Sequence, residues 1–245
     1  MVRSQREFTN RRTGMTRLLG MEIATAVIVL VVTAGIVIAA VPAWSTFEFS
    51  LVHIVNSANS APLDLLALTI NLLFSPPIAV TIIAVVAAVI FALTRSLVRA
   101  AHFVVLAALP WIGSDVIKLI VARPRPDSAL LAHHFITETS FSYPSGHTAF
   151  VASLGVAVVV LARGRRFRPP LIAIVAVVIV VTALSRVYLG VHYPTDVLAS
   201  ALYSLAAVIL VEGLFHLLLP RLDARTRRPA ATGFRGGYDP QRRSS

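Results

Sequence analysis

The sequence predicts an all-α fold, a polytopic membrane helix bundle with six transmembrane helices. Hydrophobic residues make up 57% of the 245 residues and charged residues only 13%, a balance more apolar than that of soluble domains. Several windows of about 20 residues carry no charge, and this is the length needed to cross the hydrocarbon of a bilayer. Composition and run length together indicate that the bilayer is the solvent of this chain.

Six apolar runs are candidate spans, and they lie at residues 21–43, 77–94, 100–120, 147–163, 169–189 and 194–219. Residues 21–220 are therefore expected to form one membrane domain, preceded by a basic tail at 1–20. The end of the chain, 221–245, is basic and contains Gly, Pro and Ser, so we expect a disordered tail. A signal peptide is the alternative for the first run, but the run is longer than such a segment requires.

The stretch between the first two runs, 44–76, is unusual in a chain so rich in arginine. It contains no Lys or Arg, and Glu48 and Asp64 are its charged residues. We expect it to lie outside the cell, with the apolar pattern LDLLALTINLLF as an amphipathic helix in the membrane interface.

Positive charge predicts the orientation of the bundle. Eighteen of the 22 Lys and Arg residues fall in the two tails and in the links after the second and fourth runs. The positive-inside rule therefore places both termini in the cytoplasm. The net charge of +11 does not indicate a nucleic-acid partner, because the basic residues lie between apolar runs and not on a folded polar surface. The chain has no cysteine, which excludes a cysteine nucleophile or metal ligand.

The four remaining cations lie in two of three short polar motifs on the predicted outer side. The motifs are KLIVARPRP from Lys118, YPSGHTAF at the start of the fourth run, and SRVYLGVHYPTD across the fifth and sixth. A charge at the centre of a membrane helix costs about 2.5–3.5 kcal/mol, so polar groups kept near the hydrocarbon usually mark a function. The motifs predict one active site within residues 118–196.

The spacing of these motifs resembles the signature of the type-2 phosphatidic acid phosphatase family. The matching residues are Lys118, then six residues to Arg125-Pro126; Pro144-Ser145-Gly146-His147; and Ser185-Arg186, five residues, His192, three residues and Asp196. Three separate motifs in order make a specific signal. The signature also occurs in soluble vanadium haloperoxidases and glucose-6-phosphatase-like enzymes, so it predicts the phosphate site more firmly than the substrate.

The resemblance implies a role for each motif residue. His192 is the nucleophile that forms a phosphohistidine, Asp196 orients its imidazole, and His147 protonates the leaving oxygen. Cations and the amides of a helix N-terminus hold the phosphate without a metal or other cofactor. The predicted phosphate-binding residues are Lys118, Arg125, Ser145, Gly146 and Arg186.

Structural roles compete with some of these assignments. The signature selects Arg125 by spacing, so Arg123 is expected to be an interfacial residue whose head group extends toward water. Lys118 could pair with Asp115 one helical turn earlier. Ser145 could act as an ordinary helix N-cap.

The leading functional hypothesis is a lipid phosphatase at the outer face of the cell membrane, whose substrate enters sideways from the outer leaflet. Candidate substrates are phosphatidate, diacylglycerol diphosphate, phosphatidylglycerophosphate and polyprenyl diphosphates such as undecaprenyl diphosphate. A lipid phosphotransferase is a close variant. A membrane transporter is the alternative from another class, but the charges gather at one face and not near the midplane where transporter sites lie. The sequence leaves the oligomeric state open.

Overall fold

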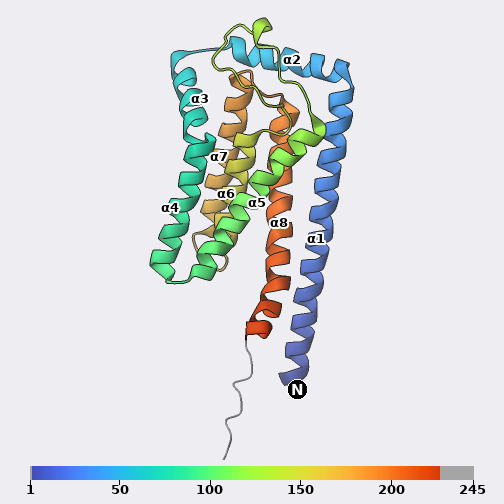
Figure 1. The fold of residues 1–245 in the computed structure, drawn as a ribbon, viewed down its shortest axis with the longest axis vertical. Helices are drawn as coiled ribbons and strands as arrows, with labels where there is room; N and C mark the ends of the chain where they lie inside the picture. Colours follow the sequence, from blue (N-terminus) through green and yellow to red (C-terminus); the bar gives the residue numbers. More distant parts are fainter. Residues whose placement is uncertain (1, 227–245) are drawn as a thin grey trace, which may run out of the picture.

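The computed structural model of the protein describes residues 2–226, which fold into α-helices joined by short links and one long loop (Figure 1). This confirms the predicted all-α class. In chain order the helices are α1 (Val2–Ala40), α2 (Pro42–Ser57), α3 (Ala61–Leu73), α4 (Pro76–Thr94), α5 (Leu97–Val121), the 3-10 turn η1 (Ser128–Leu130), α6 (Gly146–Leu161), α7 (Arg168–Tyr188) and α8 (Pro194–Thr226).

Within the described range, five helices are long and apolar enough to cross a membrane: Gly14–Ala40 of α1, Pro76–Thr94, Leu97–Val121, Arg168–Tyr188 and Pro194–Leu218 of α8. They coincide with five of the six predicted runs. The remaining run, 147–163, corresponds to α6, which has 16 residues. At 1.5 Å per residue it extends about 24 Å, less than the hydrocarbon thickness of about 30 Å. By length the structure therefore supports five spans, with α6 as a shorter apolar helix.

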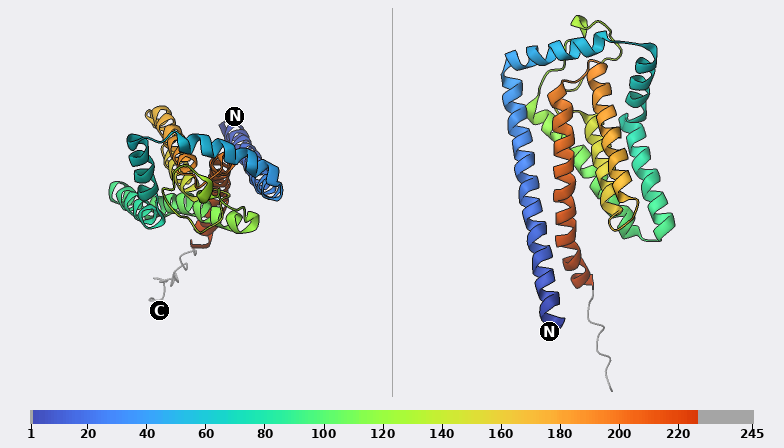
Figure 2. Two further views of the ribbon diagram at one scale, coloured as in Figure 1. Left: turned by 90° about the horizontal axis from the view of Figure 1, so that it is seen from above. Right: turned by 180° about the vertical axis from the view of Figure 1, so that it is seen from behind.

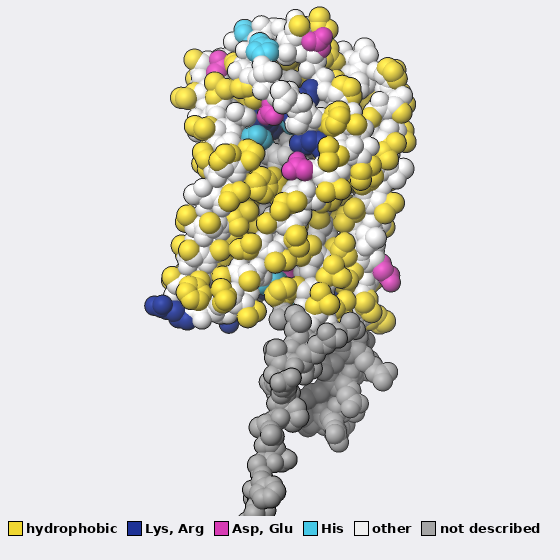
Figure 3. Space-filling view, viewed as in Figure 1, with side chains coloured by type: hydrophobic (Ala, Val, Ile, Leu, Met, Phe, Trp, Pro, Cys, Tyr) yellow, Lys and Arg dark blue, Asp and Glu magenta, His cyan; other side chains and the backbone are white. Residues whose placement is uncertain are grey.

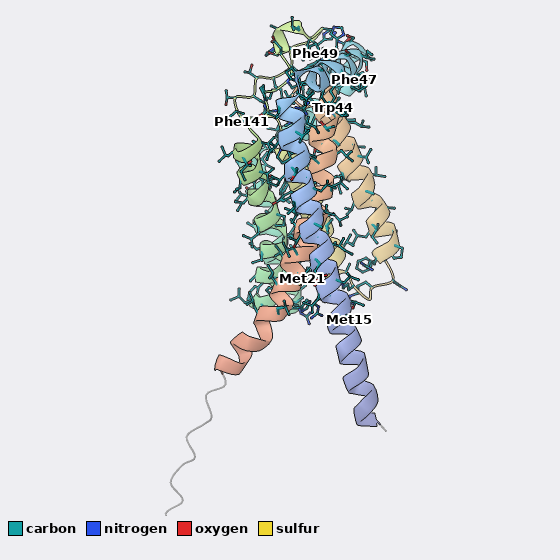
Figure 4. All side chains as sticks on the ribbon, turned by 90° about the vertical axis from the view of Figure 1, so that its right-hand side faces the viewer. Met15, Met21, Trp44, Phe47, Phe49 and Phe141 are labelled. Carbon is teal, nitrogen blue, oxygen red and sulfur yellow. The ribbon has the colours of Figure 1, made fainter. Side chains whose placement is uncertain are left out.

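Helix α2 runs across one end of the bundle, while α3 stands upright beside the other helices (Figures 1 and 2). The segment LDLLALTINLLF, expected to be an interfacial helix, corresponds to α3 and stands upright, whereas the helix that crosses the bundle end is α2, which the sequence analysis did not predict. Proline marks the first turn of each. Trp44 and Phe47 lie on the exposed side of α2 (Figure 4), whereas Glu48 and Val52 are buried. We call this end of the molecule the α2 end, and the end where α1 begins and α8 stops the tail end.

The helices also extend into the predicted tails. Helix α1 begins at Val2, so residues 2–20 of the basic segment continue the first span as a helix. Helix α8 continues to Thr226, so the first residues of the predicted C-terminal tail are helical. Residues 227–245 of that tail lie outside the described residues.

Helix α6 lies at the centre of the bundle and contacts α5, α7 and α8. Phe103 and Leu106 of α5, Phe150 of α6 and Val208 of α8 are fully buried in the core there. On the outside, large apolar side chains cover the flank of the bundle (Figure 3), and Leu30, Leu119 and Leu198 are 66%, 72% and 60% exposed. A soluble protein rarely exposes apolar patches of this extent, and the chain is an integral membrane protein.

The loop 122–145 folds back onto the α2 end and carries part of the site. Tyr143 anchors one end of it, because its hydroxyl donates to Val31 O of α1 at 2.6 Å and its ring packs directly against Gly35. No side chain larger than hydrogen fits at Gly35. Asn56 of α2 anchors the middle of the loop, since it exchanges hydrogen bonds of 2.9 and 3.1 Å with the backbone of His133.

Candidate active site

The third motif forms the turn between α7 and α8, which holds His192 at the α2 end. Gly190 in this turn has a φ of +72°, a left-handed conformation that favours glycine. Pro194 opens α8, because its fixed φ suits the start of a helix, and Asp196 follows in the first turn. His192 is 1% exposed, and its Nδ1 lies 3.5 Å from Oδ2 of Asp196. The structure thus brings together the residues predicted as nucleophile and orienting acid.

Ser142, which no motif indicated, completes this pair. Its hydroxyl donates to Oδ2 of Asp196 and lies 3.4 Å from His192 Nδ1. Burial, followed by the positive charge of Arg125, lowers the pKa of His192 well below its ordinary value, so the ring is neutral. With Nδ1–H facing the oxygens of Ser142 and Asp196, Nε2 keeps its lone pair, which is the form that attacks phosphorus.

The second motif places the start of α6 beside this turn. Ser145 occupies the predicted N-cap position, but its side chain makes no capping hydrogen bond and instead accepts one from Thr148 Oγ1 at 3.2 Å. The first N–H groups of a helix have no intrahelical acceptors, so this helix start suits an anion. Lys118 lies above it, because a Cβ at Gly146 would be 3.6 Å from Lys118 Nζ.

His147 in the first turn of α6 is held by α3. Its Nε2 lies 3.1 Å from the backbone oxygen of Asn71. Since a carbonyl only accepts, Nε2 carries the hydrogen, and Nδ1 is the nitrogen available for proton exchange. His147 and His192 line the same cavity although 45 positions of sequence separate them.

Arg125 and Arg186 converge on a carboxylate that the motifs did not indicate. Arg125 NH2 lies 3.4 Å from Glu138 Oε2, and Arg186 NH2 donates to Glu138 Oε1 at 2.7 Å. Burial alone would raise the pKa of Glu138, but the positive charges of the two arginines outweigh it and lower that pKa below its usual value. An ionised Glu138 therefore lies between two of the predicted phosphate ligands.

The remaining contacts tie these cations to the histidine turn and to α5. Arg125 NH1 lies 3.1 Å from His192 Nε2 and donates to Val191 O at 2.7 Å. Lys118 Nζ lies 3.5 Å from Asp115 Oδ1, so the alternative pairing considered for this lysine is observed. The pairing does not remove Lys118 from the site, because both residues line the cavity.

One cavity of about 590 Å³ is lined by Lys118, Arg125, Glu138, Gly146, His147 and His192. Ser145 and Arg186 are not among its lining residues, although Arg186 contacts the lining residue Glu138. Figure 3 shows acidic, basic and histidine side chains together in a hollow near the α2 end, with apolar side chains around it. On one side the cavity is lined by Phe74, Trp111, Ile112 and Leu119, of which Ile112 and Leu119 are exposed on the lipid-facing flank. The cavity therefore joins a polar, cationic floor to an apolar wall.

Arg123 does not extend toward water, and that expectation was wrong. Its side chain is fully buried, and it donates to Glu48 Oε2 and to Asp196 Oδ1 at 2.7 Å each. Its guanidinium also lies 3.9 Å above the ring of Tyr193. The reason is that two buried carboxylates, one of them 75 positions away on α2, require a cation between them.

The fold and this site define a polytopic membrane protein with a cationic, histidine-bearing site at one end of a helix bundle. Residues 99–218 match the family model of the PAP2 superfamily. On the basis of this match and the three motifs, the chain belongs to the PAP2 superfamily.

Relatives and a solved structure agree with this membership. The chain is 39% identical over 105 residues to a phosphatidylglycerophosphatase B of Bacillus subtilis (41% of this chain, 50% of the relative). It is 32% identical over 113 residues to the undecaprenyl-diphosphatase BcrC of the same organism (46% and 55%). The matches thus span about half the length of these curated relatives. The crystal structure of a transmembrane PAP2 type phosphatidylglycerolphosphate phosphatase from Bacillus subtilis shares the fold, with a TM-score of 0.66 and 24% identity over 78% of this chain and 96% of that one.

Proposed function

We propose that the protein is an integral membrane lipid phosphatase that hydrolyses a phosphomonoester or diphosphate of a lipid through a phosphohistidine intermediate. One observation carries the proposal: Lys118, Arg125, both motif histidines and Gly146 at the start of α6 line a single cavity with an apolar wall, and Arg186 contacts Glu138 in its lining. Phosphoryl transfer needs little more from a protein than positioning and charge stabilisation, which such a site supplies.

In the first step, Nε2 of His192 attacks phosphorus and forms a P–N bond while the bond from phosphorus to the leaving oxygen breaks. His147 enters this step protonated on both ring nitrogens and gives its Nδ1 proton to that oxygen, so the lipid leaves as an alcohol or, from a diphosphate, as a lipid monophosphate. The guanidinium of Arg125 lies 3.1 Å from the attacking nitrogen, and when substrate binds it can donate its hydrogen bond to a phosphate oxygen instead of to Nε2.

In the second step, water attacks the phosphohistidine, His147 takes a proton from the water, and the P–N bond breaks to release phosphate. Lys118, Arg125 and Arg186 offset the charge on the phosphate oxygens in both steps. Arg186 Nε is a buried donor without a hydrogen-bond partner among the described residues, which supports a role in binding an acceptor-rich ligand. With three cations in place, we expect activity without a divalent metal.

The apolar wall of the cavity supports a lipid substrate. A chain attached to the bound phosphate can leave the cavity past Trp111, Ile112 and Leu119 into the bilayer, so the substrate would enter sideways. The substrate classes that fit are phosphatidate-like lipids and polyprenyl diphosphates, and the names of the relatives include one of each broad kind, a glycerophospholipid phosphatase and a polyprenyl diphosphatase.

The proposal also includes an orientation, with both termini in the cytoplasm, the α2 end outside, and α6 as the sixth span. It rests on the arginines of the α4–α5 and α6–α7 links, which lie at the tail end with the start of α1 and the end of α8. Because the chain has no cysteine, Phe135→Cys and Arg165→Cys each introduce a single thiol. An impermeant reagent should label position 135 from outside and position 165 from inside; the reverse pattern would refute the orientation.

The activity is tested with purified protein in detergent, a panel of lipid phosphates and diphosphates, and a chelator. We expect release of free phosphate, inhibition by vanadate, and much lower rates with water-soluble phosphoesters. A phosphorylated second product would instead identify a phosphotransferase, and solute flux into liposomes without phosphate release would identify a transporter. Strict dependence on magnesium would contradict the mechanism.

A further inference from the structure

We propose that Arg123 and Glu48 form a positioning pair that holds Asp196 ionised and oriented toward His192, so that helix α2 supports the nucleophile. The inference rests on the proposed function, because it assigns the pair to the step in which His192 attacks phosphorus. Neither residue lines the cavity, and both act through Asp196.

The geometry of the pair is a chain of short, buried hydrogen bonds. One nitrogen of Arg123, NH1, donates to Asp196 Oδ1 at 2.7 Å and to Thr195 Oγ1 at 2.9 Å. The other, NH2, donates to Glu48 Oε2 at 2.7 Å and to Ser45 Oγ at 3.1 Å. Both ends of the guanidinium fork are thus occupied, which fixes its plane between α2 and the start of α8.

Glu48 fixes the same helix start from the opposite side. Its Oε1 accepts the backbone N–H of Thr195 at 2.8 Å, and its Oε2 accepts the hydroxyl of Thr195 at 2.7 Å. Thr195 directly precedes Asp196, so the carboxylate of Glu48 sets the position of the turn that carries Asp196. A carboxylate near the first N–H groups of a helix is favourable by itself.

Charge explains why an arginine is required. Glu48 is 2% exposed and Asp196 is fully buried, and a buried carboxylate stays ionised only if it is paired and hydrogen-bonded. Among the described residues, two basic side chains contact the carboxylate of Asp196, those of Arg123 and His192. Because His192 is neutral, Arg123 supplies the positive charge. Without it, the charge of Asp196 would be buried without a cationic partner and its Oδ1 without the donor that orients the carboxylate, so Oδ2 would no longer be held toward Nδ1–H of His192.

The side-chain contacts separate this pair from the phosphate ligands. Arg125, two residues later, contacts His192 Nε2, the attacking nitrogen, whereas Arg123 contacts the acid behind the opposite nitrogen. Loss of Arg123 is therefore expected to lower kcat and leave KM almost unchanged, while loss of a phosphate ligand should raise KM as well.

The test compares Arg123→Lys and Glu48→Gln with the unmodified protein, at equal amounts of monodisperse protein in detergent. Lysine keeps the charge but cannot make the four-bond fork, and glutamine keeps the size but removes the charge. We expect each change to lower kcat about 10- to 100-fold, by analogy with the loss of hydrogen-bonding partners that orient the histidine ligands of metal sites. KM should change by less than about threefold. Arg163→Lys, which alters an arginine paired with a glutamate at the tail end, is the matched control and should keep its rate.

A double-mutant cycle distinguishes positioning from general loss of structure. If Arg123 acts through Asp196, Arg123→Lys should cost little in a protein that already carries Asp196→Asn, so the two losses are far from additive. Additive losses, or an unchanged kcat in both single variants, would overturn the inference. If the unmodified protein releases no phosphate from any lipid, the proposed function itself fails. This result can be told apart from failure of the Arg123–Glu48 inference, because it is obtained before any variant is compared.

Discussion

The two ends of the bundle each hold two histidines, a glutamate and arginine, but the charges are arranged in opposite ways. At the tail end the carboxylate of Glu212 is the centre of the cluster. His102 Nε2 lies 2.6 Å from its Oε2, and His216 Nε2 and Arg163 NH1 lie 3.0 and 3.2 Å from its Oε1. Each of these three side chains contacts the same carboxylate, so the charged groups of the tail-end cluster are paired with one another.

At the α2 end the positively charged side chains outnumber the carboxylates that they contact. Arg125 and Arg186 both contact Glu138, and Lys118 pairs with Asp115, which is 64% exposed. Lys118 and Arg125 line one cavity together with both motif histidines. The tail end also has a cavity, of about 310 Å³, but it is smaller and His216 is the one histidine of that cluster in its lining. What distinguishes the α2 end is that two histidines and the start of a helix meet cations in one cavity, which indicates an anionic ligand.

The largest effect is expected from the proposed nucleophile at the α2 end. His192→Ala removes the nitrogen that would bond to phosphorus, so no phosphate should remain on the protein after acid quenching of a reaction with labelled lipid. The matching change at the tail end, His102→Ala, should leave this labelling in place. Persistent labelling of the His192→Ala protein would refute the assignment.

A smaller and conditional effect is expected from the second histidine of the site. His147→Ala should slow lipid hydrolysis by about 100- to 10,000-fold, the usual contribution of a general acid and base. The loss should shrink with an activated aryl phosphate, because its leaving oxygen needs no proton. Rates for the two substrates are measured side by side, and an equal loss for both would exclude His147 as the proton donor.

The response to pH follows from the environment of His192. Burial and positive charge lower its pKa well below the ordinary value of 6.5, so the neutral, attacking form persists as the pH falls through 6.5. Phosphoenzyme formation should therefore not decline there through protonation of this ring. The rate of phosphoenzyme formation is measured by rapid quench with several substrates whose phosphates have different pKa values. A pH dependence that comes from the substrate will then differ between substrates, whereas one that comes from the protein will not. A tenfold loss per pH unit below 6.5, common to all substrates, would contradict the neutral state.

The long helices of this fold can be predicted from sequence because the bilayer demands an uninterrupted apolar run. Helix α6 shows the limit of that approach. Hydropathy extends the run over 147–163, but the helix begins at Gly146 and ends at Leu161, so it falls short of the length criterion. Hydropathy also could not resolve α2, whose direction across the bundle end depends on contacts with α1, α7 and α8.

Predictability of the site differs between two arginines of the same motif. Arg125 can be selected by its spacing from Lys118, and the structure places it in the cavity. Arg123 could not be assigned, because its partner Glu48 lies on a separate helix 75 positions away. Glu138 was missed for the same reason: an isolated acid in a long loop forms no local sequence pattern, and its partner Arg186 lies 48 positions further on.

The smallest effect on activity is expected at the tail end, and it is the sharpest check of the contrast between the two clusters. Glu212→Gln removes the charge to which His102, His216 and Arg163 point, while the size of the side chain is kept. Loss of partners for groups at a partly buried helix contact should cost about 1–3 kcal/mol of stability, visible as a lower melting temperature in detergent. Phosphate release at a temperature where the variant is folded should stay within about threefold of the unmodified protein, because the cluster lies at the opposite end of α8 from Asp196. A loss of activity as large as that of His147→Ala, in a variant that remains folded, would mean that the tail-end cluster takes part in the reaction and that surplus charge alone does not identify the site.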